Sequence, residues 1–425
     1  MDSRVVGALE VWEMSGCIEI RSMDMDDPSM LPDVLKSVDR FMRFFNMKGV
    51  EIVRIREILT RDAADLDDDT KKILADNGYE FVNGFFAKGR FVAKSFSEQQ
   101  VLSYVFSKQR AVPGGRYQSV DQAMADRGYI RTDAEVLTRV SDKTSMKRQM
   151  ERGLYIKTTL LPPYVGFTTP ENMNIFRSAK DPIEDENCET VLRIIRERQP
   201  ISRKELVACS PLSERLTVES LNQLFHRSEI YQDSSSKYLA VEAERLDKYE
   251  SLKEIVRMHF RSFGLFTADT LAQFIVSRMS VVRRILMELE DEGFLVKGFL
   301  YKDDPTVVWM LKSDIDTPIR PLRNEIFLLN TQDNLHVYLR DIVKREAGAT
   351  ENVIFKGTRI IGSFKGKLTI SGAKVEDFKG SPEAKRYLKD LSLSLGVSID
   401  DRKKEQEDKD WDLSEFFIKS NPGAI

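Results

Sequence analysis

Two neighbouring arginines on one predicted helix have the side-chain type and spacing best suited to chemistry with nucleic acids. Arithmetic of 100° per residue places Arg283 and Arg284 opposite an apolar stripe. The stripe consists of Val282, Ile285, Leu286 and Leu289. An arginine on such a helix can donate two hydrogen bonds to guanine in the major groove. The alternative is an ordinary solvated helix face, because the far end of this helix is acidic, from Glu288 to Glu292.

Further basic residues lie in two other segments of the chain. Lys297 and Lys302 fall on a predicted β-hairpin, from which lysines commonly reach phosphate. The segment "TSMKRQMERGLYIK" combines cations with the nearby Tyr155 and Tyr164, a composition that suits a surface tracking one strand, or equally a solvated helix. The residues predicted to contact DNA are Arg278, Ser280, Arg283, Arg284, Lys297, Lys302, Lys147, Arg148 and Arg152. A third basic group consists of Lys356, Arg359, Lys365 and Lys367.

No catalytic motif can be assigned to this sequence. The segment "GSFKGKLT" resembles a phosphate loop only superficially, because three residues separate Gly362 from Gly366 and Leu368 follows the lysine. The nucleophile-elbow, zinc-helix and helicase ATP-binding motifs do not occur. The three cysteines and three histidines are scattered, which disfavours a metal centre. We therefore expect no catalytic residues, no metal and no cofactor.

The clearest structural unit spans residues 251–312. Its first helix is predicted in "SLKEIVRMHFRSFG". A second begins at the N-cap Thr267, and a third begins near Ser277 and stops at Gly293. The stretch "FLVKGFLYKDDPTVVWML" then reads as two strands around a turn. Three helices followed by a hairpin predict a winged helix.

Two looser copies of this pattern precede it. Residues 187–242 supply three helices and a hairpin that turns between Asp233 and Ser236. Residues 33–95 are a weaker match, with helices expected on both sides of "VEIVRIREIL" and a hairpin at "FFAKGRFVAKSF". Residues 325–379 change to short β runs, including "IFLLN", "NLHVYL" and "NVIFKG", which suggest a small barrel closed by a helix that begins at Ser381.

The predicted fold class is α+β, with tandem winged-helix domains, a small β-barrel-like domain and a flexible C-terminal tail. The expected domains are a winged helix at 1–95, a mainly helical connection at 96–186, winged helices at 187–245 and 246–318, a small β domain with its closing helix at 319–399, and a charged tether with an apolar motif at 400–425.

The composition indicates an ordinary globular protein. Hydrophobic residues make up 41% of the 425 residues and charged residues 31%. No apolar run is long enough to span a membrane, and the N-terminus does not resemble a signal peptide. We therefore expect a cytoplasmic protein without a membrane partner. The net charge of −3 gives no general attraction to nucleic acid, so any basic face must be local.

The order of these parts resembles two groups of DNA-acting proteins. Tandem winged helices, then "EIFLLNTQDNLHVYLRD", "VIFKGTRIIGSF" and a terminal helix, are similar to the alkylpurine DNA glycosylase (AlkZ/YcaQ-like) group. The C-terminal region of Lhr-type DNA helicases has the same arrangement. "GALEVWEMSGCIEIRS" and "DRFMRFFNMKGVEIVRI" look like the interior of such a helicase. Without helicase motifs, the chain alone is not expected to unwind DNA.

The resemblance assigns no catalytic residue. Glycosylases of this group use a Gln-x-Gln or Gln-x-Asp motif, and none of the segments "SEQQV", "SKQRA" and "RYQSVDQ" has that spacing. The glutamines considered are Gln99, Gln100, Gln109, Gln118 and Gln122.

The C-terminal segment resembles a sliding-clamp ligand. In "DWDLSEFF", Leu413, Phe416 and Phe417 have the register of a clamp-binding motif, with Asp410 where glutamine is usual. One helical turn would place the three apolar side chains on one side as a plug for a pocket. The alternative is that this segment folds back onto the β domain.

These observations favour a DNA-binding protein of repair or replication, of archaeal type. It would grip duplex or forked DNA through its winged helices, and its partners would be DNA, a sliding clamp and a helicase subunit. The alternatives are a DNA glycosylase acting on alkylated or crosslinked bases, a winged-helix transcriptional regulator, or a module that binds only proteins.

Overall fold

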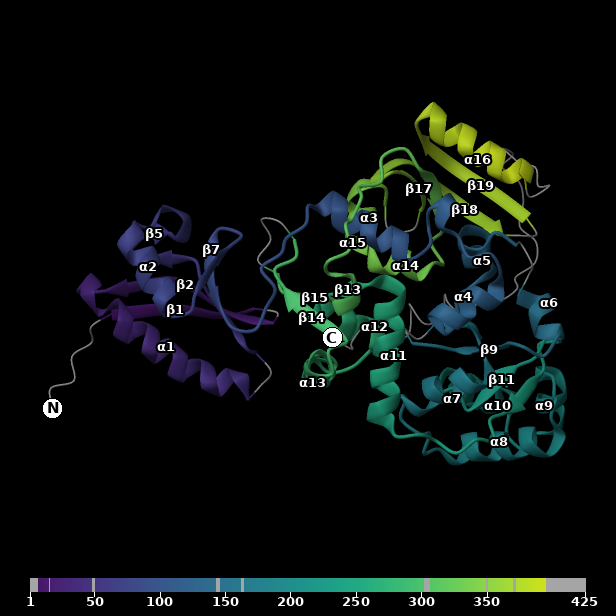
Figure 1. Ribbon diagram of the computed structural model, residues 1–425. Helices are drawn as coiled ribbons and strands as arrows, with labels where there is room; N and C mark the ends of the chain where they lie inside the picture. Colours follow the sequence, from purple (N-terminus) through teal and green to yellow (C-terminus); the bar gives the residue numbers. More distant parts are fainter. Residues whose placement is uncertain are drawn as a thin grey trace. The chain divides into compact units, whose positions relative to one another are not determined.

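The computed structural model describes residues 7–14, 16–47, 50–142, 146–161, 164–301, 306–348, 351–369 and 372–394. Helices and strands alternate along this part of the chain and form several small sheets, so the predicted α+β class is confirmed (Figure 1). The chain forms two compact units. Unit 1 contains the described residues within 1–105 and 263–321, and unit 2 contains the described residues within 106–262 and 322–425.

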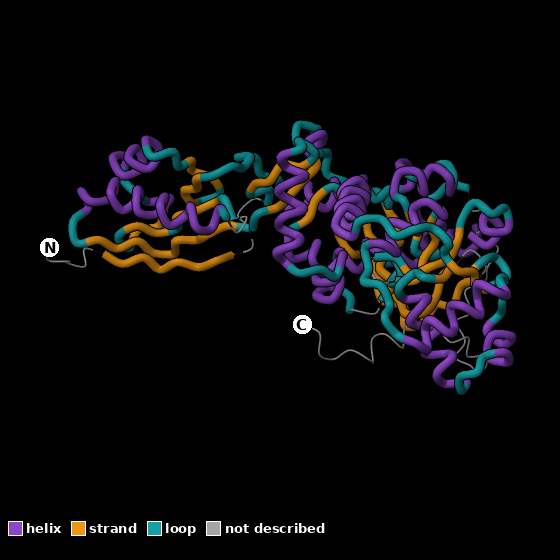
Figure 2. Tube along the Cα trace, turned by 90° about the horizontal axis from the view of Figure 1, so that it is seen from below, coloured by secondary structure: helices purple, strands orange, loops and turns teal. Residues whose placement is uncertain are grey.

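Unit 1 begins with a five-stranded sheet of order β1-β2-β3-β7-β6, in which β2 and β3 are parallel and the other neighbours antiparallel. The strands are β1 (Gly7–Met14), β2 (Cys17–Met25), β3 (Ile52–Ile55), β6 (Glu80–Val82) and β7 (Phe85–Lys88). The helices are α1 (Leu31–Asn46) and α2 (Asp68–Asp76), and β4 (Glu57–Ile58) pairs with β5 (Arg61–Asp62). Figure 2 shows helices lying along one side of these strands.

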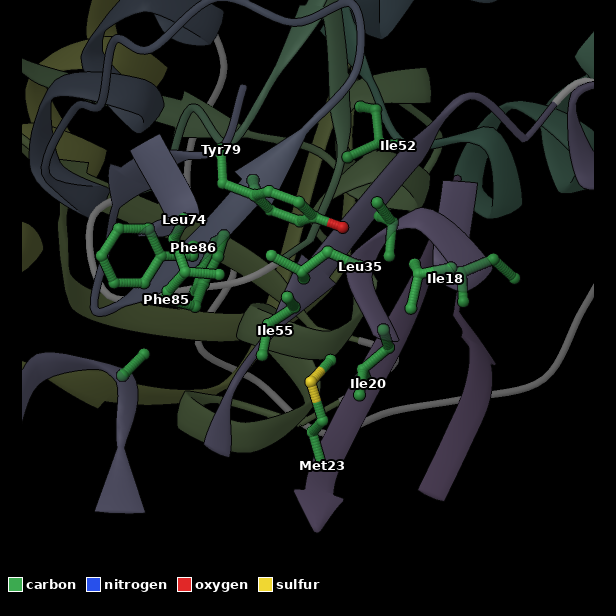
Figure 3. Packing of buried hydrophobic residues seen from close by; sticks show 14 of the residues in the cluster. Ile18, Ile20, Met23, Leu35, Ile52, Ile55, Leu74, Tyr79, Phe85 and Phe86 are labelled. Carbon is green, nitrogen blue, oxygen red and sulfur yellow. The ribbon is translucent and has the colours of Figure 1, made fainter. Parts of the chain in front are cut away.

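The core of this sheet explains why it forms. Leu35 of α1 and Leu74 of α2 are buried with Ile18, Ile20 and Ile55 from the strands (Figure 3). Burying each such side chain contributes about 1.5–3 kcal/mol. The segment expected to lie between two helices of a winged helix is instead the central strand β3, so residues 7–88 differ from the expected three-helix pattern. All four residues of β3 are buried, because strands flank it on both sides.

The remainder of unit 1 follows the predicted order of a winged helix. It contains α12 (Ala268–Ile275), α13 (Met279–Asp291) and a three-stranded sheet of order β13-β15-β14. The strands are β13 (Leu265–Phe266), β14 (Leu295–Gly298) and β15 (Val308–Leu311). The preceding helix, α11 (Lys248–Phe263), ends at the boundary between the units. Residues 302–305, which include the predicted turn, lie outside the described residues.

Unit 2 contains the other predicted three-helix-and-hairpin pattern. Its elements are α8 (Glu186–Arg198), α9 (Arg203–Cys209), α10 (Glu214–His226), β11 (Ile230–Gln232) and β12 (Tyr238–Ala240). Caps explain the helix starts: Asp185 accepts from the Cys188 amide, Ser202 and Glu205 form a capping box, and Ser213 accepts from the Leu216 amide. The hairpin extends into a five-stranded sheet of order β12-β11-β9-β10-β8.

The region before this pattern combines helices with three short strands. Its helices are α3 (Glu98–Lys108), α4 (Val120–Arg127), α5 (Asp133–Arg139), α6 (Met146–Glu151) and α7 (Pro170–Ser178). Its strands are β8 (Tyr129–Ile130), β9 (Ile156–Thr159) and β10 (Val165–Thr168). The expectation of a mainly helical connection therefore missed strands that complete the sheet of the following hairpin.

The C-terminal part of unit 2 is an open sheet of order β16-β17-β18-β19. Its elements are β16 (Ile326–Leu329), α14 (Asn334–Tyr338), α15 (Arg340–Glu346), β17 (Asn352–Lys356), β18 (Arg359–Thr369), β19 (Gly372–Gly380) and α16 (Pro382–Ser394). Among the described residues these strands do not close into the expected barrel, because β16 and β19 each pair on one side only. The segment "NLHVYL", expected to be a strand, is α14, which Asp333 caps by accepting from the Leu335 amide.

Candidate nucleic-acid interface

Helix α13 presents the side chains predicted to read DNA bases. It begins directly after α12 because Val276 adopts a left-handed conformation with φ of 47°. Its N-cap is Arg278, one residue later than predicted. Val282, Ile285, Leu286 and Leu289 are buried, as the helical period requires. The opposite side of the helix is therefore the side available for contact.

Three of the four predicted residues on this helix are exposed. Arg278 and Ser280 face solvent at the first turn. The Arg284 side chain is 70% exposed, and its Nε lies 3.1 Å from Glu288 Oε1. An exposed pair of this kind contributes at most about 1 kcal/mol, so phosphate can compete for Arg284. We define the α13 face as Arg278, Ser280 and Arg284.

Arg283 is engaged elsewhere in unit 1. Its side chain is only 20% exposed, and Nη1 donates to Glu13 Oε1 of β1 over 3.0 Å. A base contact by Arg283 would have to break this ion pair. Sequence reasoning placed Arg283 beside Arg284 but had no signal for Glu13, which lies 270 residues away in the chain.

Lys297 does not occupy the position predicted for it. Its side chain is 3% exposed, and its ammonium lies 2.9 Å from Glu290 Oε2 and also pairs with Glu51. Burial raises the pKa of the Glu290 carboxyl, and Lys297 partly offsets this rise. The prediction that Lys297 faces solvent on the wing was therefore wrong, because the side chain is buried and pairs with the buried Glu290 and the partly exposed Glu51. Lys302 lies outside the described residues.

The rest of the hairpin in unit 1 is also covered. Phe299, which follows β14, packs its ring against Phe85 and Phe91, with centroid distances of 4.8 and 5.4 Å. The Asn83 amide donates to the carbonyl oxygens of Phe299 and Tyr301 over 3.1 and 2.9 Å. This wing is therefore a packing surface for the N-terminal sheet over the residues that the structure describes.

The second predicted basic cluster lies on α6 of unit 2 and on Arg152, which directly follows this helix. Lys147, Arg148 and Arg152 are exposed, whereas Gln149 beneath them is buried. Arg152 Nη1 donates to Gln149 Oε1 over 3.1 Å. Arg148, Gln149, Arg152 and Asp142 line a hollow of about 400 Å³. We define the α6 cluster as Lys147, Arg148 and Arg152, a local cationic surface of the type that phosphates attract.

The tyrosines expected beside this cluster make contacts with other residues of unit 2. Tyr155 is buried and donates from its hydroxyl to Asp121. Tyr164 stacks under the Arg131 guanidinium, whose carbon lies 3.7 Å from the ring centroid. The cluster therefore offers charge rather than the predicted alternation of charge and aromatic rings.

Two of the four residues of the third basic group are paired with carboxylates. Lys356 lies 2.9 Å from Glu383, and Lys365 lies 3.4 Å from Asp377. Arg359 is exposed, and the side chain of Lys367 lies outside the description. The charges of Lys356 and Lys365 are therefore largely offset, whereas Arg359 stays an exposed cation.

A hollow of about 430 Å³ lies beside α8 in unit 2. Arg177, Arg196 and Arg245 contribute to its lining together with the apolar Leu192. Glu229 accepts from Arg177 over 2.8 Å and also pairs with Arg245. Arg177 and Arg245 thus share one carboxylate, and the lining as a whole has three arginines against the two carboxylates Glu189 and Glu229.

Unit 2 contains a buried ionic network that was not predicted from the sequence. Arg127 pairs with Glu135 over 2.7 Å, and Arg139 pairs with Asp333, with all four side chains at most 1% exposed. Glu135 also accepts from the Arg131 amide over 2.6 Å. Both carboxylates are committed to arginines, which suits a structural role better than proton transfer. No sequence signal distinguishes these charges from solvated helix residues.

Near this network, Tyr129 contacts His259. The tyrosine hydroxyl lies 3.3 Å from His259 Nδ1 and accepts from the Asn334 amide over 3.1 Å. Burial lowers the pKa of His259 to about 3, and the nearby Arg127 adds to this effect. His259 is therefore neutral at physiological pH. Among the described residues no group of histidine, cysteine and carboxylate side chains has the arrangement of a metal site.

The elements above define an α+β chain with two three-helix-and-hairpin patterns and locally exposed cations. The fold is similar to that of the Streptomyces sahachiroi DNA glycosylase AlkZ, with a TM-score of 0.54 and 16% sequence identity. The match covers 72% of this chain and 98% of the AlkZ chain. This likeness confirms the resemblance to the AlkZ fold.

Comparison of the sequence with known families and curated proteins identified no relative of this chain. No protein-family profile matches the chain, and no curated protein matches its sequence. The described part of the chain contains no helix that is both long and apolar enough to cross a bilayer.

Proposed function

We propose that this protein binds DNA in repair or replication, using the α13 face and the α6 cluster as separate contact surfaces. The observation that carries the proposal is the N-terminal half of α13, where Arg278, Ser280 and Arg284 are exposed on a helix of winged-helix pattern. In helix-turn-helix proteins the corresponding third helix enters the major groove. The likeness to a DNA glycosylase fold supports the same assignment.

The proposed contacts are adjusted to what is accessible. Lys297 is left out because it is buried between carboxylates. Arg283 contributes only if it exchanges Glu13 for DNA. The α6 cluster would hold phosphates, which position a protein without reading sequence.

The test is fluorescence anisotropy with labelled duplex, forked and single-stranded DNA. We expect duplex or forked DNA to bind, and Arg278→Glu with Arg284→Glu to weaken binding about tenfold or more. The matched control is Arg345→Glu on α15, where the arginine is 65% exposed beside Glu346. Equal affinities for wild type and the α13 double variant would refute the α13 contact.

The association with other proteins is part of the same proposal. Leu413, Phe416 and Phe417, which lie outside the described residues, would hook a sliding clamp, and a separate helicase subunit would supply a motor. Truncation to residues 1–405 is expected to abolish retention on an immobilised clamp while leaving the affinity for DNA unchanged. Clamp retention by the truncated chain would remove this part of the proposal.

DNA glycosylase activity is the second candidate, favoured by the fold of AlkZ. It predicts release of free base from duplex that carries alkylated or crosslinked purines, since such enzymes extrude their target base. Chromatography of the products would detect the released base. If the substrate stays intact with excess protein, glycosylase activity is refuted and the non-catalytic DNA-binding function remains.

A further inference from the structure

We propose that the exposed side of helix α1 is a binding site for single-stranded DNA, formed by Phe41 and Phe44 with Arg40 and Arg43. We call these four residues the α1 platform. The inference rests on the proposed DNA-binding function and deepens it, because it names a form of DNA and a surface remote in sequence from α13 and α6.

The two phenylalanine rings are exposed although they are large and apolar. Phe41 is 43% and Phe44 50% exposed, and Met47 beyond them is 80% exposed. The most exposed large apolar side chains of a protein often mark a binding surface when they lie together. Here they share one side of α1, because residues three apart are neighbours on a helix.

The rings are held in place from below. Phe45 is half-buried and packs against the core of the sheet. Its ring centroid lies 4.8 Å from that of Phe41 and 5.4 Å from that of Phe44, with interplanar angles of 58° and 87°. This support restricts both exposed rings before any ligand arrives. A restricted ring loses little conformational entropy when a base stacks on it.

The charge of the α1 platform is positive. Arg40 and Arg43 are exposed, and neither has an ion-pair partner among the described residues. The acidic residues of α1 are already neutralised, since Asp33 lies 2.9 Å from Lys36 and Asp39 lies 2.8 Å from Lys88. The cations beside the rings therefore complement a polyanion better than a neutral or basic protein surface.

The repeat of arginine and phenylalanine points to a nucleic-acid strand. Each exposed ring directly follows an exposed guanidinium, at Arg40-Phe41 and again at Arg43-Phe44. The two pairs are separated by about 4.5 Å along the helix axis, comparable with the axial rise of about 3.4 Å per nucleotide in one stacked strand. Stacking on a ring requires an unpaired base face, which single-stranded DNA offers and duplex DNA does not.

The test uses anisotropy of full-length protein with a labelled thymidine 12-mer, an abasic 12-mer of the same charge, and a duplex. The variants are F41A/F44A, F41L/F44L and R40A/R43A. F41L/F44L keeps apolar bulk on the helix and removes only the aromatic faces. The matched controls are F81A, which removes a ring 51% exposed on β6, and K36A, which removes a lysine paired with Asp33.

We expect both phenylalanine variants to bind the thymidine 12-mer at least about tenfold more weakly, since stacking contributes about 5- to 150-fold per base. Their affinity for the duplex and for the abasic 12-mer should not change. For R40A/R43A, the slope of log K against log salt should become shallower by about 1.4 for single strands. F81A should behave as wild type, and K36A, which also frees Asp33, should leave the preference for the thymidine 12-mer over the abasic 12-mer unchanged.

Two results would overturn the α1 platform. One is a folded F41L/F44L protein that binds the thymidine 12-mer as wild type does. The other is a wild-type protein that binds duplex but not the thymidine 12-mer, which would leave the rings to a protein partner. In both cases the proposed DNA-binding function survives. Absence of binding to every DNA at low salt would instead refute both.

Discussion

The Lys297 ammonium lies 2.9 Å from Glu290 Oε2, with the two side chains 3% and 6% exposed. Glu51 pairs with the same ammonium, and Arg90 lies 3.1 Å from Glu290 Oε1. A lysine on a predicted wing thus joins the hairpin, the end of α13 and the N-terminal sheet within unit 1. Over its described residues the hairpin of this winged-helix pattern serves packing, and the proposed DNA contact lies in the N-terminal half of α13.

Replacing Lys297 tests this role. Lys297→Met leaves the Glu290 carboxylate without one of its two cations, so the free energy of unfolding should fall by about 3–5 kcal/mol. Urea denaturation measures the change. Anisotropy at a temperature where the variant is folded should show unchanged affinity for duplex DNA. A variant with wild-type stability and weakened DNA binding would contradict the packing role and indicate that Lys297 contacts DNA.

A second prediction concerns the buried pair of Arg139 and Asp333. Asp333 also caps α14, where its side chain accepts from the Leu335 amide over 2.8 Å. Asp333→Asn keeps an acceptor for the cap but removes the charge, and should cost about 3–5 kcal/mol because Arg139 stays buried and uncompensated. Asp333→Ala should cost about 1 kcal/mol more through loss of the cap. Equal stability of wild type and Asp333→Asn in urea would contradict the network.

Stability should depend on pH through the histidines. Burial is the first cause of a lowered pKa for all three, to about 4 for His226 and about 3 for His259, with His336 also lowered. Below about pH 6.5 the unfolded chain takes up protons that the folded chain does not, so stability falls as pH falls through this range. Each histidine adds at most about 1.4 kcal/mol per pH unit to the slope.

His259→Asn isolates one part of that dependence. The variant should lose about 1.4 kcal/mol per pH unit of the slope between pH 6 and pH 4, whatever its stability at pH 7. Denaturant titrations at several pH values give the slope. An unchanged slope would mean that His259 is protonated in the folded protein.

Much of the secondary structure could be predicted because its signals are local. The N-cap Thr267 and the apolar period of α13 each depend on fewer than about twenty neighbouring residues, and both helices begin close to their expected places. The strand β3 could not be identified in the same way. Its four residues are buried on both faces, and a short apolar run fits a helix and a central strand equally well.

The candidate site was harder to predict because burial is not local. The exposure of Arg278 and Arg284 follows from their own helix, because its apolar stripe determines which side of α13 is buried. Lys297 is buried because Glu51 lies opposite it, 246 residues away in the sequence. The same limit applies to Arg139 and Asp333, which are 194 residues apart. Charged residues give no local sign that a distant partner will bury them.

Charge on the α6 cluster should control salt sensitivity independently of the α13 face. Replacing Lys147, Arg148 and Arg152 by alanine should make the slope of log K against log salt shallower by about 2.7 for duplex DNA, if each cation neutralises one phosphate. Preference among DNA sequences should not change, since phosphate contacts carry no sequence information. An unchanged slope would place this cluster outside the interface.

The most direct test of the account is the affinity of the full chain for labelled duplex DNA at a series of salt concentrations. We predict measurable binding that weakens steeply with salt, with a shallower slope for the variant that carries both Arg278→Glu and Arg284→Glu. No binding at low salt, or binding indifferent to salt, would contradict DNA contact through these cations. The exposed arginines would then belong to a surface that binds proteins.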